Sequence, residues 1–202
     1  AWPFRRAASA RPPPPAVAPS LSSWAAEVVT PAPDLAHRAG ALVSFDVNYR
    51  SKLWTVQEAR SVLSELVRRA DIVIASEDEL GLVAAGDEPA AAQELAAYGV
   101  GQLVIKRGAR GATVWLEGVA HHAPAVQVPV LDTIGAGDAL TAGYLSGLLD
   151  GLPPSSALRH GTVTGASAFS AVGAGEGLPT RNDMPLHDIE EGHPRGRSNA
   201  GE

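Results

Sequence analysis

The sequence predicts an α/β domain in which a mainly parallel sheet carries helices on both faces. Short apolar runs alternate along the chain with segments whose apolar residues recur at helical spacing. Such alternation is typical of a parallel sheet packed between helices. The chain has 202 residues, of which 45% are hydrophobic, enough for one buried core. Because such folds bind ligands at the carboxyl ends of the strands, the residues that follow each apolar run are the candidate functional residues.

Composition excludes several classes of function. The formal net charge of -6 argues against a nucleic-acid surface, although it is compatible with a local basic pocket. No apolar stretch reaches the length of a membrane span, and Trp2–Arg6 is not followed by the apolar core of a secretory signal. Cysteine is absent, which rules out disulfides and fits a reducing compartment. We therefore expect a cytoplasmic protein with small-molecule ligands and no nucleic-acid or membrane partner.

The two ends of the chain differ in composition from its middle. Residues 1–34 are rich in proline, alanine and serine, which indicates a disordered or loosely extended segment. Residues 191–202 have no periodicity and are predicted to form a flexible tail. The segment Asp34–Gly40 is predicted to be the last turns of a helix that enters the first strand. The folded domain is thus expected over residues 35–190.

The first predicted strand, Ala41–Asp46, leads into the polar residues Asn48 and Arg50. An asparagine side chain can donate to sugar hydroxyls and accept from them. An arginine can form a bidentate pair with a carboxylate or with phosphate oxygens. Asn48 and Arg50 are therefore candidate substrate-binding residues, and the alternative for Arg50 is an ordinary solvated loop arginine.

A helix with one apolar face is predicted next, followed by the strand Asp71–Ala75 and then by Ser76 and Glu79. The spacing of Ser76 and Glu79 matches a capping box, so local helix chemistry alone could explain the pair. A capping role does not exclude a contribution to a nearby metal. Both roles stay open for Ser76, and a functional role is favoured for Glu79. The apolar helix face comprises Val56, Ala59, Leu63, Leu66 and Val67.

A further helix is predicted around Ala91–Ala96, before the strand Gln102–Lys106. That strand ends in a basic turn with Gly108 and Gly111, and the chain returns as a strand over residues 113–116. Glycines let a ligand approach the backbone closely, and Lys106 would supply positive charge. The segment is weak evidence by itself, because any β-hairpin can use glycine in this way.

The most informative stretch is Asp132–Asp138, which joins a predicted buried strand over residues 126–131 to a predicted helix over residues 139–149. The start of a helix exposes unpaired backbone N–H groups and attracts anions. Small residues at Gly135–Gly137 would let a phosphate reach those donors. A carboxylate at Asp138 would repel a resting phosphate, so we interpret it as a base that takes a proton from an attacking hydroxyl. The alternative is a tight turn with a helix-capping aspartate.

The last predicted element is a helix of small residues over Ser155–Ala171, which follows a break at Leu152–Pro154. Its alanine, glycine and serine content favours simple packing on the sheet. Earlier in the chain, His121 and His122 are adjacent at the end of a predicted hairpin. We expect them to be surface residues rather than metal ligands, because no cysteine or second cluster of ligands accompanies them.

Together these motifs resemble those of the ribokinase-like (PfkB-type) carbohydrate kinases. Residues Asp132–Asp138 resemble the family signature Asp-Thr-x-Gly-Ala-Gly-Asp, and residues 106–111 resemble its Lys-x-Gly-x-x-Gly hairpin. The resemblance implies a ribokinase-like three-layer α/β/α fold, with ATP and Mg²⁺ as cofactors. It also implies that the backbone of Gly135, Ala136 and Gly137 forms an anion hole for the transferred phosphate and that Asp138 is the catalytic base.

The resemblance implies further roles around the nucleotide. Lys106, Gly108 and Gly111 would lie against ATP, and Thr162 stands where the family usually has an asparagine near the adenine. Ser76 and Glu79 occupy the positions of the family's Asn-x-x-Glu motif, which helps to organise Mg²⁺ and phosphate, so Glu79 would act on Mg²⁺ indirectly. Asp132 could help to place a monovalent cation such as K⁺, although a capping or strand-end role fits it equally well.

The first motif resembles one branch of the family. Asn48-Tyr49-Arg50, followed by Lys-Leu-Trp at residues 52–54, is similar to 2-keto-3-deoxygluconate kinases, with Val47 in the place of the usual proline. The resemblance implies phosphorylation of a sugar acid, 2-keto-3-deoxygluconate to its 6-phosphate, with Asn48, Arg50 and Asp138 at the substrate. The alternatives are a ribokinase or fructokinase with another sugar, and a non-catalytic nucleotide-binding remnant.

The resemblance covers only the C-terminal part of such a kinase, from about residue 35 to residue 187. The N-terminal half of the family, with its β lid over the sugar, has no counterpart in residues 1–34. We therefore expect a C-terminal fragment of the fold, which arose by truncation, gene decay or a misassigned start. A homo-oligomer is compatible with the resemblance, although family dimers commonly form through the lid.

Overall fold

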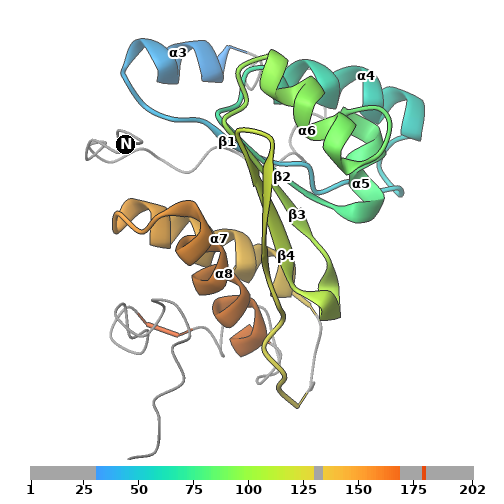
Figure 1. Ribbon diagram of the computed structural model, residues 1–202. Coiled ribbons are helices and arrows are strands. Elements are labelled where there is room, and N and C mark those ends of the chain that lie inside the picture. Colours follow the sequence, from blue (N-terminus) through green and yellow to red (C-terminus); the bar gives the residue numbers. More distant parts are fainter. Residues whose placement is uncertain (1–30, 130–133, 169–178, 181–202) are drawn as a thin grey trace, which may run out of the picture.

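The computed structural model describes residues 31–129, 134–168 and 179–180, and the description that follows is confined to them. A five-stranded sheet lies between two groups of helices (Figure 1). Helices α4, α5 and α6 cover one face, and α7 and α8 cover the other. This confirms the predicted α/β class and its three layers.

The strands are ordered β1-β2-β3-β4-β5 across the sheet. The first three are parallel, whereas β4 and β5 run antiparallel to their neighbours, so the sheet is mixed. Asp46 pairs with Ile74, and Ser76 pairs with Lys106, which brings the carboxyl ends of the parallel strands to one edge. The strands are β1 Ser44–Asp46, β2 Ile72–Ser76, β3 Gln102–Lys106, β4 Ala112–Leu116 and β5 Val119–Ala123.

The helices begin where the sequence offers caps. The Thr55 hydroxyl accepts from the Glu58 N–H at 3.3 Å, and the Glu58 carboxylate accepts from the Thr55 N–H at 2.8 Å, so α4 begins with a capping box. Asp87 caps α6 by accepting from the Ala90 N–H at 3.1 Å. The helices are α3 Ala32–Arg38, α4 Val56–Val67, α5 Glu77–Val83, α6 Glu88–Ala97, α7 Ala136–Leu149 and α8 Pro154–Ala168, with a 3₁₀ turn η1 at Gly108–Arg110.

Alternate residues of the strands fill two separate cores. Within β2, Val73 and Ala75 belong to the core under α4–α6, and Ile72 and Ile74 belong to the core under α7 and α8. Successive side chains of a strand point to opposite faces, so a continuous apolar run is required where both faces are covered. This explains why the buried strands read as unbroken apolar runs in the sequence.

Glycines bring α7 and α8 into close contact. A Cβ on Gly143 would lie 2.6 Å from the Cβ of Thr164, and one on Gly161 would lie 2.8 Å from the Leu140 carbonyl oxygen. No real Cβ tolerates either distance, so only glycine permits this approach. The small residues of α8 thus serve packing, as predicted, and they pack on α7 as well as on the sheet.

The predicted buried strand over residues 126–131 is wrong for its described part. Residues 124–129 form no strand, and Val126 is 41% exposed. The last strand among the described residues is instead β5, which lacks apolar alternation and is exposed except at Ala123. The chain directly after β5 passes close to Gly111, where φ is 93° and a Cβ would lie 2.6 Å from the Ala125 nitrogen.

No helix among the described residues is long and apolar enough to cross a bilayer.

Candidate active site

Charged and polar side chains meet where β1 and β3 end beside the first turn of α7. The Lys106 ammonium donates to both carboxylate oxygens of Asp46, at 2.8 and 3.0 Å. The Thr141 hydroxyl of α7 donates to the same carboxylate at 2.8 Å. A Cβ built on Gly137 would lie 3.8 Å from the Lys106 Nζ, so the ammonium lies directly beside the α7 turn. The four residues link two strand ends to the start of one helix.

The first turn of α7 is open to solvent. Gly135 is its N-cap residue with φ 81°, a left-handed conformation that favours glycine. Gly137 and Asp138 are exposed, and Ala136 is half-buried. Asp138 forms no side-chain hydrogen bond within the described residues, so the structure does not support a capping role for it. The turn therefore presents backbone N–H groups and one carboxylate outward.

The Glu79 carboxylate, by contrast, accepts backbone hydrogen bonds with both of its oxygens. Its two oxygens accept from the Tyr49 N–H at 2.7 Å and from the Ser76 N–H at 2.8 Å. Ser76 is the N-cap residue of α5, and Asn48 has φ 36°, a left-handed conformation that asparagine tolerates better than most residues. Glu79 thus holds the loop after β1 against the end of β2.

The same loop shows where the two predicted substrate residues lie. Arg50 is exposed and Asn48 is half-buried at the carboxyl end of β1. Val47 is fully buried, and its N–H donates to the Ile74 carbonyl at 2.9 Å. A proline at this position would lack that donor, so valine extends the pairing of β1 with β2 by one bond.

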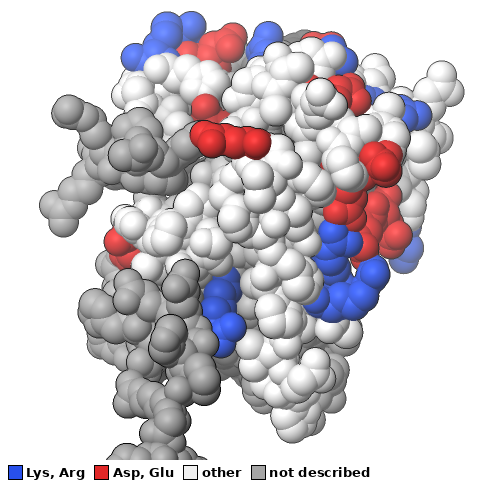
Figure 2. Space-filling view, viewed as in Figure 1, with Lys and Arg blue, Asp and Glu red and all other residues white. Residues whose placement is uncertain are grey.

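The basic turn after β3 is largely neutralised. Arg107 donates to Glu77 at 2.6 Å, to Glu88, and to the Thr113 hydroxyl at 2.9 Å, while Arg110 pairs with Glu77. Hydrogen bonding to Glu88 outweighs burial and raises the pKa of Arg107. Figure 2 shows the resulting patch of mixed charge at the edge of the molecule. Lys106, by contrast, pairs with Asp46 and lies beside the first turn of α7.

Glycine has different functions at the two ends of this turn. Gly108 has φ 55° and open space around its Cα, whereas Gly111 is required by the close passage of residues 123–125. Gly108 thus remains compatible with a ligand approach, and Gly111 is explained by packing. Both were predicted to lie against the nucleotide.

Thr162 makes no side-chain hydrogen bond with Asp46, Lys106 or Thr141 within the described residues; its own environment is inside α8. Thr162 is 4% exposed, and its hydroxyl donates to the Arg159 carbonyl of the same helix at 2.9 Å. His121 and His122 are exposed on β5, as expected, and no group of three potential metal ligands occurs within the described part of the chain. Asp132 lies outside the described residues.

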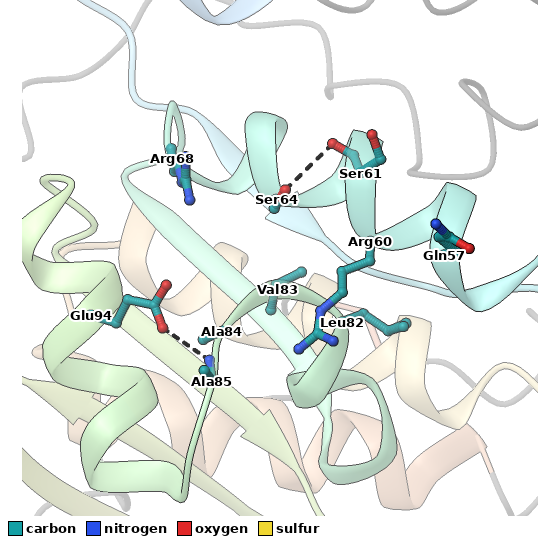
Figure 3. A pocket seen from close by; sticks show the side chains of 10 residues that line it. All are labelled: Gln57, Arg60, Ser61, Ser64, Arg68, Leu82, Val83, Ala84, Ala85 and Glu94. Atoms are coloured by element: carbon teal, nitrogen blue, oxygen red, sulfur yellow. Dashed lines mark hydrogen bonds between the residues drawn. The ribbon is translucent and has the colours of Figure 1, made fainter.

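A separate hollow of about 410 Å³ lies on the outer helical layer (Figure 3). It is lined by α4 and by the end of α5, with Arg60, Arg68 and Glu94 among its polar residues. None of the residues at the strand ends lines it. We therefore place the candidate site at the strand ends and not in this hollow.

Sequence reasoning missed two residues of the cluster. Asp46 ends an apolar strand directly before Asn48 and Arg50, and that position was a usable signal. Thr141 lies one helical turn after Asp138, so it could have been placed on the same side of α7. The contact between Asp46 and Lys106 spans 60 residues of sequence and depends on strand register.

Comparison with known proteins gives one consistent family. Residues 20–181 match the family model described as "pfkB family carbohydrate kinase". A 2-dehydro-3-deoxygalactonokinase of Haloferax volcanii is 35% identical over 153 residues, which is 74% of this chain and 48% of that protein. A fructokinase of Klebsiella pneumoniae is 37% identical over 158 residues, 73% of this chain and 51% of that protein. The chain thus spans about half the length of the curated relatives it matches.

Solved structures agree with the fold. The aminoimidazole riboside kinase of Salmonella enterica, complexed with its riboside and an ATP analogue, superposes with a TM-score of 0.70 and 32% identity over 82% of this chain and 57% of that chain. A structure from Escherichia coli that contains ATP and Mg²⁺ gives a TM-score of 0.74 and 27% identity over 85% of this chain and 54% of that chain. The ribokinase-like fold predicted from the motifs is therefore confirmed.

Proposed function

Because this chain belongs to the pfkB family of carbohydrate kinases, we propose that it transfers the γ-phosphoryl group of ATP to a hydroxyl of a sugar acid, with 2-keto-3-deoxygluconate as the first candidate. The observation that carries this proposal is the exposed Asp138 in the open first turn of α7, beside Lys106 and Gly137. A turn with free N–H donors suits a phosphate, and a carboxylate next to it suits a base.

The residues present fit a bound nucleotide. The γ-phosphate would lie over the backbone of Gly135–Gly137, with the Lys106 ammonium close by as the cation. Mg²⁺, bound together with ATP, would neutralise phosphate charge, and Glu79 would act on it indirectly, by holding the Tyr49 and Ser76 backbone in place. Arg107 and Arg110 are engaged with Glu77 and Glu88 and are not assigned to the phosphates.

The proposed reaction forms a bond between the acceptor oxygen and the γ-phosphorus and breaks the bond from that phosphorus to the β,γ-bridging oxygen. Asp138 takes the proton of the attacking hydroxyl, and ADP leaves. The charge that spreads over the phosphoryl oxygens is stabilised by the α7 N–H groups and by Lys106, a contribution usually larger than that of the proton transfer.

The sugar-acid assignment rests on the loop after β1. Arg50 is exposed there and can pair with a substrate carboxylate, while Asn48 can bond to hydroxyls. The similarity to a 2-dehydro-3-deoxygalactonokinase supports this class of substrate, whereas the similarity to a fructokinase supports a neutral sugar as the second candidate. A non-catalytic remnant is the third, because the chain covers about half of its relatives.

The test is ADP release by the purified chain with Mg²⁺-ATP and a panel of 2-keto-3-deoxygluconate, related sugar acids, fructose and ribose. The Asp138→Asn variant is run beside it, with Asp34→Asn as a matched control on α3. Release that requires both a sugar acid and Asp138 supports the proposal. Release with fructose or ribose alone favours the second candidate, and no release above background favours the remnant.

A further inference from the structure

We propose that Asp46 is a positioning residue of the phosphate site, which holds the Lys106 ammonium beside the first turn of α7 and fixes that turn on β1 through Thr141. The inference rests on the proposed function for its catalytic consequence, but its structural part can be tested without turnover.

The geometry around Asp46 supports this role. One carboxylate oxygen accepts from Lys106 at 2.8 Å, and the other accepts from Lys106 at 3.0 Å and from Thr141 at 2.8 Å. The Lys106 and Asp46 side chains are only 14% and 17% exposed, so water screens the pair weakly. Each oxygen of the carboxylate is thus used to connect β3 or α7 to the end of β1.

A lysine side chain without a bonded partner would not stay in one position beside the α7 turn. Its four-carbon stem has many rotamers, and fixing one of them costs conformational entropy. The Asp46 carboxylate offsets that cost before any nucleotide arrives, because it holds the ammonium within reach of the space over Gly137. The pair is electrically neutral as a whole, so its effect on an incoming phosphate comes from where the ammonium lies.

The substitution Asp46→Asn separates charge from position. Removing one negative charge near the phosphates should leave ATP binding equal or tighter, whereas loosening Lys106 and α7 should lower kcat. A general loss of fold would weaken both. The split between the nucleotide affinity and kcat is therefore a readout that a merely structural role would not produce.

The chain contains only two lysines, Lys52 and Lys106, which makes a direct assay possible. Brief acetylation with acetic anhydride, read by peptide mass spectrometry, gives the labelling of Lys106 relative to the exposed Lys52. Asp46→Asn should raise this ratio about fivefold or more, because the ammonium loses its charged partner. Asp46→Glu should restore part of the protection, and Asp34→Asn should behave as wild type, because its ion pair with Arg69 is exposed.

Added Mg²⁺-ATP is the second arm. Mg²⁺-ATP should slow the acetylation of Lys106 but not that of Lys52, and the ATP concentration that gives half of this protection should be no higher in Asp46→Asn than in wild type. In the same variant, kcat with the best acceptor should fall about tenfold or more. Thr141→Val keeps the ion pair and serves if Asp46→Asn does not fold; it should lower kcat about threefold with Lys106 still protected.

Three results would overturn the inference. The first is a Lys106 labelling ratio that Asp46→Asn leaves unchanged. The second is an unchanged kcat in that variant. The third is a kcat that Thr141→Val leaves unchanged when Asp46→Asn cannot be purified. If wild type itself shows no turnover with any acceptor, the kinase proposal fails, and the labelling ratio alone then decides whether Asp46 positions Lys106.

Discussion

The first turn of α7, beside the end of β3, and the first turn of α5, which holds the loop after β1, both carry an acidic side chain, but the two carboxylates differ in their hydrogen bonds. Glu79 binds two backbone N–H groups and locks the loop in place, whereas Asp138 is exposed and makes no side-chain hydrogen bond within the described residues. The difference teaches that a carboxylate already bonded to the backbone serves the scaffold, and one left open is the candidate for chemistry.

The largest effect should follow from Asp138→Asn. We expect kcat to fall by about 10²–10⁴-fold, the usual contribution of a general base, with a change in the free energy of unfolding below about 1 kcal/mol. The small effect on stability follows because the side chain is exposed and unbonded. Steady-state kinetics and urea unfolding measure the two quantities. A large loss of stability would show that Asp138 belongs to the scaffold after all.

Gly161→Ala should give the largest loss of stability. The new Cβ would meet the Leu140 carbonyl oxygen at 2.8 Å and the Tyr144 nitrogen at 3.2 Å, both backbone atoms that cannot move aside. We expect the free energy of unfolding to fall by about 3 kcal/mol, at the upper end for overpacking.

Gly81→Ala is the matched control for Gly161→Ala. Gly81 also lies within a helix, but a Cβ there meets nothing within 4 Å. That substitution should stabilise the protein by about 0.5–1 kcal/mol, because alanine favours the helix more than glycine does. Equal effects of the two substitutions would argue against close contact between α7 and α8.

Glu79→Gln tests the closed region. A glutamine keeps one acceptor oxygen but turns an amide group toward a backbone N–H, so one of the two bonds is lost. We expect the free energy of unfolding to fall by about 2 kcal/mol, within the range for hydrogen bonds to charged groups. In Glu94→Gln, where the carboxylate accepts a single exposed bond from the Ala85 N–H at 2.9 Å, the loss should be smaller. No difference between these variants in urea unfolding would remove the contrast with Asp138.

The smallest effect concerns pH. Burial lowers the pKa of His160, and its Nδ1 has no hydrogen-bond partner among the residues that the structure describes. Because the folded pKa lies below the unfolded value of about 6.5, the unfolded chain binds the proton first, so this contribution to stability is complete above pH 6.5 and is lost as the pH falls from there to the folded pKa. His160→Gln should reduce the difference between the free energies of unfolding measured by urea at pH 7.5 and at pH 5.5. His121→Gln, at an exposed position of β5, is the control for loss of a histidine.

Periodicity predicted the buried parts of this fold well. The strands β1, β2 and β3 and the helices α4 and α7 were placed correctly, because burial on two faces or on one helical face leaves a strong apolar pattern. The strand β5 was missed because its residues are mostly exposed and it is held by backbone pairing with β4. The alternating valines after residue 125 were wrongly read as a strand, since alternation marks an extended chain whether or not a partner strand is present.

The candidate site was predicted in its parts and not in its connections. The motifs located Gly137, Lys106, Glu79 and Asp138 in the sequence, but the Asp46–Lys106 pair joins residues on non-adjacent strands and follows from register. The pairing of Arg107 with Glu77 and Glu88 likewise depends on contacts between residues 30 and 19 positions apart in the sequence. The functional roles given to Gly137, Lys106, Glu79 and Asp138 stay predictions, as do those of the other proposed site residues, which include Ser76, Gly108, Thr162, Asn48 and Asp132.

The glycine contacts between α7 and α8 have a mechanical consequence. Near one end of the pair a Cβ on Gly147 would lie 3.1 Å from Ala157, and near the other a Cβ on Gly165 would lie 3.2 Å from the carbonyl oxygen of Ala136, the first residue of α7. Because the two backbones approach this closely near both ends of the pair, a shift of α8 along its axis would displace the first turn of α7 as well. The two helices would then move as one rigid unit, and its movement would reach the edge of the sheet where Asp138 lies.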